Sequence, residues 1–276
     1  MYKSPFLWRT LKAMRQKKGV IFMTKTVRKG KIILSTFLFL FAILFSTEGV
    51  SGKEADIQLK ETEFEDIQLL QWQKSDELYE MNIQLPIFTT DALNAQMKKY
   101  MEEQITAFLE AIDGHVTSKR PGNLYITVDI LKSGIGLYSL VFSEQIYTGG
   151  ANWNDTNTVL LADVEKDQFM QQANLFQDVV KAREIIRPLV VEELKKDENL
   201  DGYLLEDQIE KWLRDPDYQF QNMYIDCANK RLGFIFDKYE VAAGVVGMPQ
   251  VYLPLDEKLF SLFKDTWQER MQQCQK

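Results

Sequence analysis

The turn at residues 147–154 carries side chains of the types that bind small ligands. It joins two aromatic residues, a glycine pair and several polar groups: Tyr147, Thr148, Gly149, Gly150, Asn152, Trp153 and Asn154. Aromatic stacking combined with amide hydrogen bonds suits a sugar or a peptide. In the alternative, structural interpretation the glycines supply positive φ and Trp153 packs on the domain. We predict a binding site here and leave the structural alternative open.

A second candidate is the pair Tyr239 and Glu240, which could place a carboxylate at a functional cleft. Glycoside hydrolysis requires paired carboxylates. Residues 53–276 contain 39 acidic side chains, however, so pairs are expected by coincidence. We therefore treat Tyr239 and Glu240 as binding residues and predict no catalytic residue. A cell-wall hydrolase or deacetylase that uses carboxylates is the alternative.

The sequence gives little support for a metal site or for a nucleophilic catalytic site. His115 is the only histidine, so a site that needs two imidazoles from one chain is excluded. The segment from Asp197 follows the calcium-loop template with Asp201 and Gly202, but its twelfth position is Gln208 instead of the bidentate glutamate. We predict an acidic helix-to-helix connection capped by Gly202, with no metal and no cofactor.

The formal charge of -7 is the sum of two opposite segments. Residues 1–47 contain ten basic and no acidic side chains, whereas residues 53–276 contain 23 basic and 39 acidic ones, which gives 23 - 39 = -16. An apolar run at 32–45 follows three basic residues, as in a secretory signal. We expect either cleavage near residue 52 or an uncleaved membrane anchor. In both cases the acidic part is extracytoplasmic, either secreted or held at the membrane. A domain this acidic is a poor nucleic-acid binder.

Cys227 and Cys274 both lie in the exported part. We expect two separate thiols, because two cysteines do not make a disulfide framework. A disulfide is the alternative if the compartment is oxidising and the Cα atoms approach within about 7 Å.

Apolar periodicity predicts an α+β fold with antiparallel sheets and packed helices. Strands are expected at 67–72, 78–85, 124–130, 137–142, 156–161, 220–226, 232–237 and 251–253. Helices are expected from Asp91, its N-cap, to Gly114, at 179–196 and 206–213, and as one terminal helix with Leu259, Phe260, Phe263, Trp267 and Met271 on one face. The domains expected are a basic segment with its export helix (1–52), a linker (53–66) and two α/β lobes (67–165 and 166–276).

Two segments carry a resemblance to a known family. The run from Tyr147 to Ala151 resembles the first signature of the extracytoplasmic domain of unknown function shared by RsiV-type anti-sigma factors and the N-terminal region of the PdaC peptidoglycan deacetylase. The run from Phe236 to Pro254 resembles its second signature. The family usually has a histidine and a glycine where this chain has Asn152 and Trp153.

The resemblance implies a non-catalytic cell-envelope module. In one branch of the family the domain is the receptor part of an anti-sigma factor that binds lysozyme, and in another it accompanies a cell-wall enzyme. We therefore expect a binding or sensing module for lysozyme, another cationic protein or peptidoglycan. The charge of -16 would speed encounter with a basic protein.

Overall fold

The computed structural model describes residues 55–274, which belong to the compact unit Ser51–Lys276. The predicted export helix lies outside the described residues. Among those described, no helix is long and apolar enough to span a membrane. The strands are β1 (Asp56–Glu61), β2 (Ile67–Ser75), β3 (Tyr79–Phe88), β4 (Gly122–Gly134), β5 (Leu137–Tyr147), β6 (Asn154–Asp163), β7 (Gln168–Met170), β8 (Met223–Asp226), β9 (Arg231–Ile235) and β10 (Gln250–Pro254). The α-helices are α3 (Asp91–Ile112), α4 (Val179–Lys196), α5 (Glu206–Arg214), α6 (Glu257–Phe260) and α7 (Asp265–Met271).

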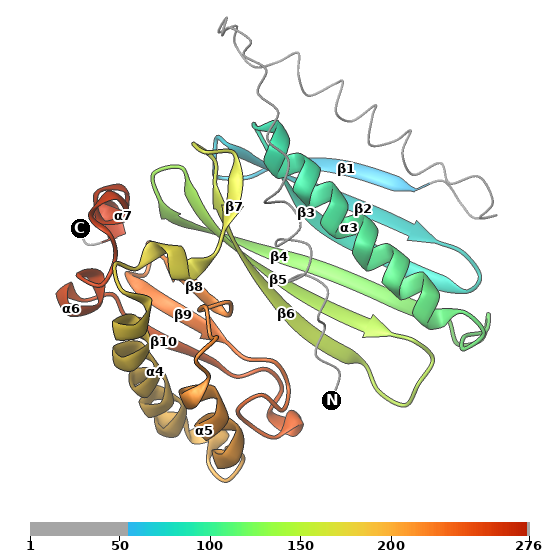
Figure 1. Ribbon diagram of the computed structural model, residues 1–276. Coiled ribbons are helices and arrows are strands. Elements are labelled where there is room, and N and C mark those ends of the chain that lie inside the picture. Colours follow the sequence, from blue (N-terminus) through green and yellow to red (C-terminus); the bar gives the residue numbers. More distant parts are fainter. Residues whose placement is uncertain (1–54, 275–276) are drawn as a thin grey trace, which may run out of the picture. The chain divides into compact units, whose positions relative to one another are not determined.

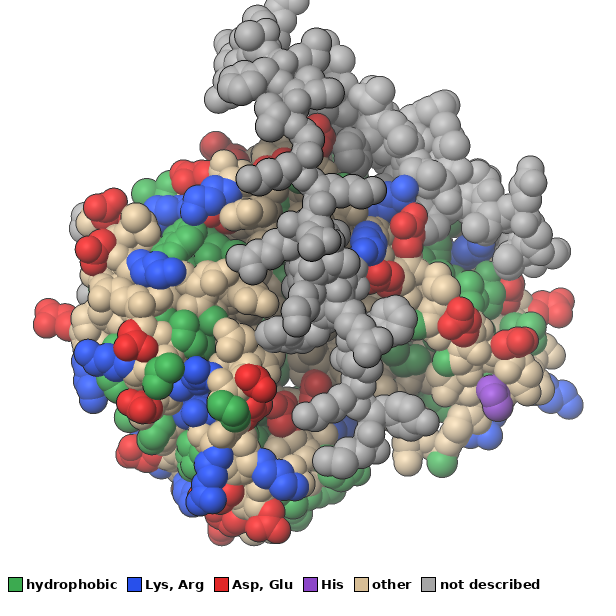
Figure 2. Space-filling view, viewed as in Figure 1, with side chains coloured by type: hydrophobic (Ala, Val, Ile, Leu, Met, Phe, Trp, Pro, Cys, Tyr) green, Lys and Arg blue, Asp and Glu red, His purple; other side chains and the backbone are tan. Residues whose placement is uncertain are grey.

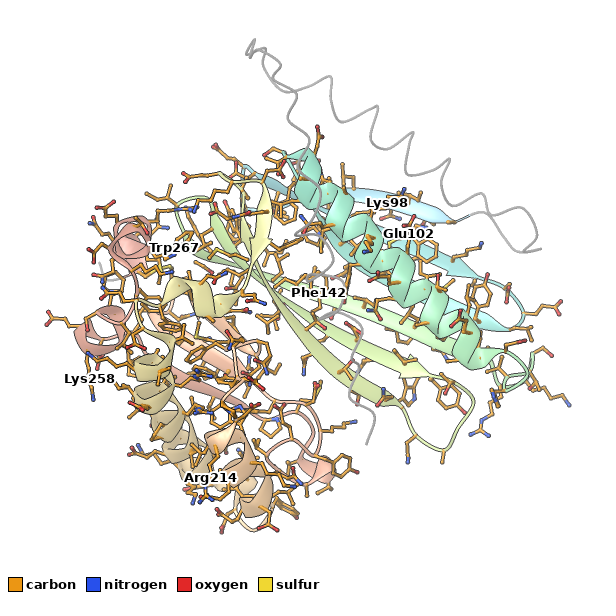
Figure 3. The ribbon with its side chains drawn as sticks, viewed as in Figure 1. Lys98, Glu102, Phe142, Arg214, Lys258 and Trp267 are labelled. Atoms are coloured by element: carbon orange, nitrogen blue, oxygen red, sulfur yellow. A yellow bond between two sulfur atoms is a disulfide. The ribbon has the colours of Figure 1, made fainter. Side chains whose placement is uncertain are left out.

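The first seven strands form one sheet in chain order, and α3 covers one of its faces (Figure 1). All neighbouring strands are antiparallel except β3 and β4, which pair in parallel. A parallel pair needs a crossover connection, and α3 provides it. The ring centroid of Tyr100 on α3 lies 5.0 Å from that of Phe142 on β5 (Figure 3). The sheet face with Phe142 is therefore the α3 face. The predicted α+β class is confirmed.

The second half packs a three-stranded sheet, in the order β10-β9-β8, on the opposite face of the first sheet. Val141 of β5 and Val159 of β6 form a buried cluster with Tyr224 of β8. Because side chains alternate between the faces of a strand, Val141 points away from the α3 face. Helix α4 then packs against β10. The first sheet is thus covered by α3 on one side and partly by the second half on the other.

The beginning of α3 differs from the prediction. Asp91 is the first helical residue instead of the N-cap, and Thr90 at the cap makes no side-chain capping bond. Instead, Asp167 from the turn between β6 and β7 accepts the N–H groups of Ala92 and Leu93 at 3.0 and 2.9 Å. A distant carboxylate satisfies the free helix donors, so local spacing could not reveal it.

Two further segments differ from the prediction. Part of the expected linker at 53–66 is strand β1, whose Ile57 pairs with Trp72 of β2. The prediction of a single terminal helix is wrong, because the chain leaves helical geometry between α6 and α7. There Phe263 forms a β-bridge with Phe176, and its ring is fully buried. Burial of Phe263 therefore outweighs continuation of the helix.

Cys227 and Cys274 form a disulfide, so the expectation of two separate thiols is wrong. Their Cα atoms lie 4.2 Å apart although 47 residues separate them in sequence. The bond joins the end of β8 to the turn after α7 and is buried. It closes a loop that contains β9, β10 and both C-terminal helices.

Candidate functional site

The turn between β5 and β6 contains the first predicted site. Gly149 has a φ of +87°, as the structural interpretation expects, whereas Gly150 does not adopt such a conformation. A Cβ atom on Gly149 would also collide with the carbonyl oxygen of His115, in the loop after α3. A side chain is thus excluded at Gly149 for two reasons. His115 is exposed, and Figure 2 shows its imidazole on the surface.

Trp153 is the exposed centre of an aromatic cluster, which we call the Trp153 platform. Its ring stacks on Tyr125 of β4 with centroids 5.6 Å apart and an interplanar angle of 22°. It also lies 5.5 Å from the ring of Tyr147 at 34°. Despite both contacts, 42% of Trp153 is exposed. The indole is held by the domain and still open to a ligand.

Arg120 completes the platform, and the sequence did not reveal it. Its Nε donates a hydrogen bond to the Tyr147 hydroxyl oxygen, and its Nη2 donates to the carbonyl oxygen of Gly150 at 2.5 Å. The Tyr147 hydroxyl donates to the same carbonyl at 3.1 Å. Arg120 lies in a polar loop 27 residues before Tyr147, so no local pattern linked the two.

The predicted pair Tyr239 and Glu240 lies in the turn between β9 and β10. Tyr239 is 68% exposed and has a φ of +67°, a conformation that is uncommon for residues other than glycine. A Cβ atom on Gly244 would collide with the Tyr239 ring, so that ring would have to move. Glu240 accepts the backbone N–H of Asp237 at 3.0 Å. Glu240 thus stabilises a turn.

The second signature segment contacts the beginning of β6, the strand that directly follows the platform turn. Lys238 forms an ion pair with Asp155. The carboxylate of Asp237 accepts the backbone N–H of Asn157 at 2.9 Å. The Asn157 amide in turn contacts the sulfur of Met248 at 2.7 Å. The second signature is therefore fixed to the first residues of β6, directly after the platform.

A buried carboxylate lies on the α3 face near the same strands. Glu144 accepts hydrogen bonds from the hydroxyls of Tyr100 and Thr158, at 2.6 and 3.2 Å, and is only 5% exposed. Burial raises the pKa of Glu144, and the charge of Asp237 adds to this, although the hydroxyl bonds oppose it. Burial likewise raises the pKa of Tyr100 well above its ordinary value. These groups are enclosed and serve the packing of α3.

The acidic segment from Asp197 connects α4 to α5, as predicted, but its capping bond comes from Asp197, which precedes the short 3-10 helix Glu198–Leu200. Asp197 accepts the backbone N–H of Asn199 at 2.9 Å, and Gly202 has a φ of +74°. Within residues 55–274 no three His, Cys, Asp or Glu side chains gather in a way that could hold a metal ion.

Comparison with known families confirms the predicted resemblance to a DUF3298/PdaC-type family. Residues 72–154 match the model described as Deacetylase PdaC, and residues 173–256 match the model described as Protein of unknown function (DUF3298). The first match ends at the platform turn, and the second contains the second signature. A search of curated proteins finds no match.

Two solved structures are similar to this chain. A DUF3298 family member from Bacteroides fragilis NCTC 9343 is 15% identical, with a TM-score of 0.50, and the alignment covers 80% of this chain and 98% of that one. A DUF3298 family protein from Pseudomonas aeruginosa PAO1 is 14% identical, with a TM-score of 0.49, and the alignment covers 77% and 93%. At 15% identity, the similarity to the Bacteroides fragilis structure concerns the fold alone.

Proposed function

We propose that the chain is a non-catalytic, extracytoplasmic binding or sensing module of the cell envelope, and that the Trp153 platform is its contact point. The exposed indole, held between two tyrosines, carries the proposal. A rigid aromatic ring loses little entropy on binding and offers a large contact area. The buried disulfide supports export, because such bonds persist in oxidising compartments.

Two partner classes suit the platform, namely cell-wall glycan and a cationic protein such as lysozyme. Glycan suits the aromatic ring and the amides around it. A cationic protein suits the charge of -16 over residues 53–276. Acidic and basic side chains are interspersed on the face shown in Figure 2, so charge would guide encounter without marking one spot.

A carboxylate hydrolase or deacetylase is the weaker candidate. Glu144 and Asp237 have raised pKa values because of burial, as a catalytic acid would. Glu144 is enclosed, however, and Asp237 already accepts a backbone N–H of β6. The enclosure of Glu144 and the hydrogen bond of Asp237 favour structural roles for these two carboxylates.

The test compares binding by the full chain and by Trp153→Ala. Peptidoglycan and lysozyme are offered in separate arms, and bound protein is measured by co-sedimentation and by calorimetry. We expect one of the two ligands to bind. Trp153→Ala should weaken this binding at least about tenfold, as is typical of an aromatic side chain that becomes buried in a complex. Tyr203→Ala is the matched control, because Tyr203 is 46% exposed and lies outside the platform. Equal loss in both variants would reject the platform.

A further inference from the structure

The open part of the first sheet presents a row of uncharged amide side chains that leads to the Trp153 platform. The strand register places Gln73 opposite Asn82, Asn82 opposite Tyr125, and Tyr125 opposite Gln145. Gln145 in turn faces Asp155 on β6. We call the four residues Gln73, Asn82, Tyr125 and Gln145 the amide row. Directly opposed residues share a face, so the row crosses four neighbouring strands.

The row points away from α3. Tyr79 on β3 packs its ring 6.5 Å from Phe108 of α3, so the alternate position Asn82 lies on the other face. On β5, Glu144 bonds to Tyr100 of α3, so its neighbour Gln145 also lies on the other face. The row therefore belongs to the face on which the second half packs.

The second half approaches the row at its β6 end, where Lys238 pairs with Asp155 opposite Gln145. Its buried apolar contact with the sheet lies at Val141 and Val159, each four residues along its strand from Gln145 and Asp155. At about 3.3 Å per residue this is a distance of about 13 Å. Gln145 is exposed, and the other three row residues are half-buried. Four strands about 4.8 Å apart give the row a length of about 14 Å.

The row is ready to form hydrogen bonds. Among residues 55–274, the side-chain amides of Gln73, Asn82 and Gln145 make no hydrogen bond with any other residue. Each amide offers two donors and an acceptor with two lone pairs. At the end of the row, Asp155 is neutralised by Lys238. Beside it, Tyr125 supports the stacked ring of Trp153.

We propose that the amide row and the Trp153 platform together bind a linear, uncharged glycan strand. This inference rests on the proposed binding function and names its ligand class. Sugar hydroxyls and acetamido groups both donate and accept, so they match amides better than carboxylates or ammonium groups do. One ring of the strand would stack on Trp153 while the next ones cross the row. A protein partner fits less well, because interface centres are rich in apolar and aromatic side chains and this row contains only Tyr125.

The test titrates the full chain with a hexamer of N-acetylglucosamine and, in a second arm, with a hexamer of β-1,4-linked glucose. Calorimetry measures affinity, and tryptophan fluorescence reports contact with Trp153. Comparison of the two arms shows whether binding requires the acetamido groups or only the sugar hydroxyls. The variants are Asn82→Ala, Gln145→Ala and Trp153→Ala. The control is Gln96→Ala, whose amide donates to the carbonyl oxygen of Ala92 within α3. Thermal unfolding checks that every variant is folded.

We expect at least one hexamer to bind, Asn82→Ala and Gln145→Ala each to weaken it about three- to tenfold, and Gln96→Ala to leave it unchanged. If Trp153→Ala abolishes binding while both row variants bind normally, the row is rejected and the platform stands. If neither hexamer binds but lysozyme does so through Trp153, the glycan inference fails and the proposed function survives. The glycan inference would also fail if the chain bound neither hexamer but formed a dimer that Gln145→Ala disrupts.

Discussion

The carboxylate of Asp237 accepts the backbone N–H of Asn157 at 2.9 Å and so joins segments that lie 80 residues apart. β7 pairs with β6 only from Leu161 to Asp163, so the earlier part of this edge has no neighbouring strand. Asp237 satisfies one of its free donors. The bond, with the Lys238–Asp155 ion pair, holds the second half against the strand that follows the platform.

Removing this acceptor should destabilise the chain. We predict that Asp237→Ala lowers the free energy of unfolding by about 1 to 3 kcal/mol, because the N–H of Asn157 loses its partner. Asp237→Asn retains an oxygen acceptor and should lose less. Urea unfolding of both variants measures the difference. Equal losses in the two variants would show that the hydrogen bond is not the cause.

Glu144 should make stability depend on pH. Burial raises its pKa in the folded chain above the ordinary value of 4.5. The folded chain therefore holds this proton more tightly than the unfolded chain does. The resulting stabilisation is complete below pH 4.5 and is lost as pH rises through the raised pKa.

Glu144→Gln removes the titrating group and keeps an oxygen that can accept from Tyr100. We predict that the variant gains stability relative to the natural chain as pH rises from 4.5 towards neutrality. Urea midpoints measured across this range provide the comparison. Glu102→Gln is the control, because Glu102 lies on the exposed face of α3 and pairs with Lys98 (Figure 3). Parallel curves for Glu144→Gln and the natural chain would contradict the prediction.

Arg270 fixes α7 to the end of β6. Its two terminal nitrogens each donate to Asp163 at 3.0 Å, and the Asp163 side chain is fully buried. We predict that Arg270→Ala costs about 1.5 to 3 kcal/mol, because the buried Asp163 carboxylate loses two charge-assisted hydrogen bonds and keeps only its contacts with Lys166. Arg214→Ala, which breaks an ion pair at an 81% exposed side chain, should cost less than about 1 kcal/mol. Similar losses in chemical denaturation would reject the assigned role of Arg270.

The disulfide should contribute substantially to stability. Its 47-residue separation corresponds to about 4 kcal/mol if the bond acts by restricting the unfolded chain. We predict that the Cys227→Ala, Cys274→Ala double variant unfolds at lower urea concentration, and that a reductant shifts the natural chain in the same direction. The reductant should leave the double variant unchanged. An unaltered midpoint in the reduced natural chain would contradict this prediction.

Local periodicity predicted most elements, because burial of one face fixes the spacing of apolar residues. α4 begins and ends at the predicted residues, and the hairpin of β4 and β5 was recognised from its alternating runs. Features that depend on distant residues were missed. Examples are the cap of α3 by Asp167 and the disulfide of Cys227 with Cys274.

The candidate site was predicted in part for the same reason. Trp153 and Tyr147 lie in one turn, so their composition drew attention to it. Tyr125 and Arg120 reach the platform only because β4 pairs with β5 and the loop after α3 folds back. Strand pairing is not encoded in any local window, so these two contributors could be found only in the folded chain.

The most direct test of the account is a quantitative assay of binding and turnover with purified peptidoglycan. The full chain is incubated with the polymer, bound protein is separated by sedimentation, and soluble muropeptides and acetate are measured in the supernatant. A parallel arm measures lysozyme binding by calorimetry. We predict that the chain binds one of the two ligands, that Trp153→Ala weakens this binding at least about tenfold, and that nothing is released. Release of muropeptides or acetate by the natural chain, or undiminished binding by Trp153→Ala, would contradict it.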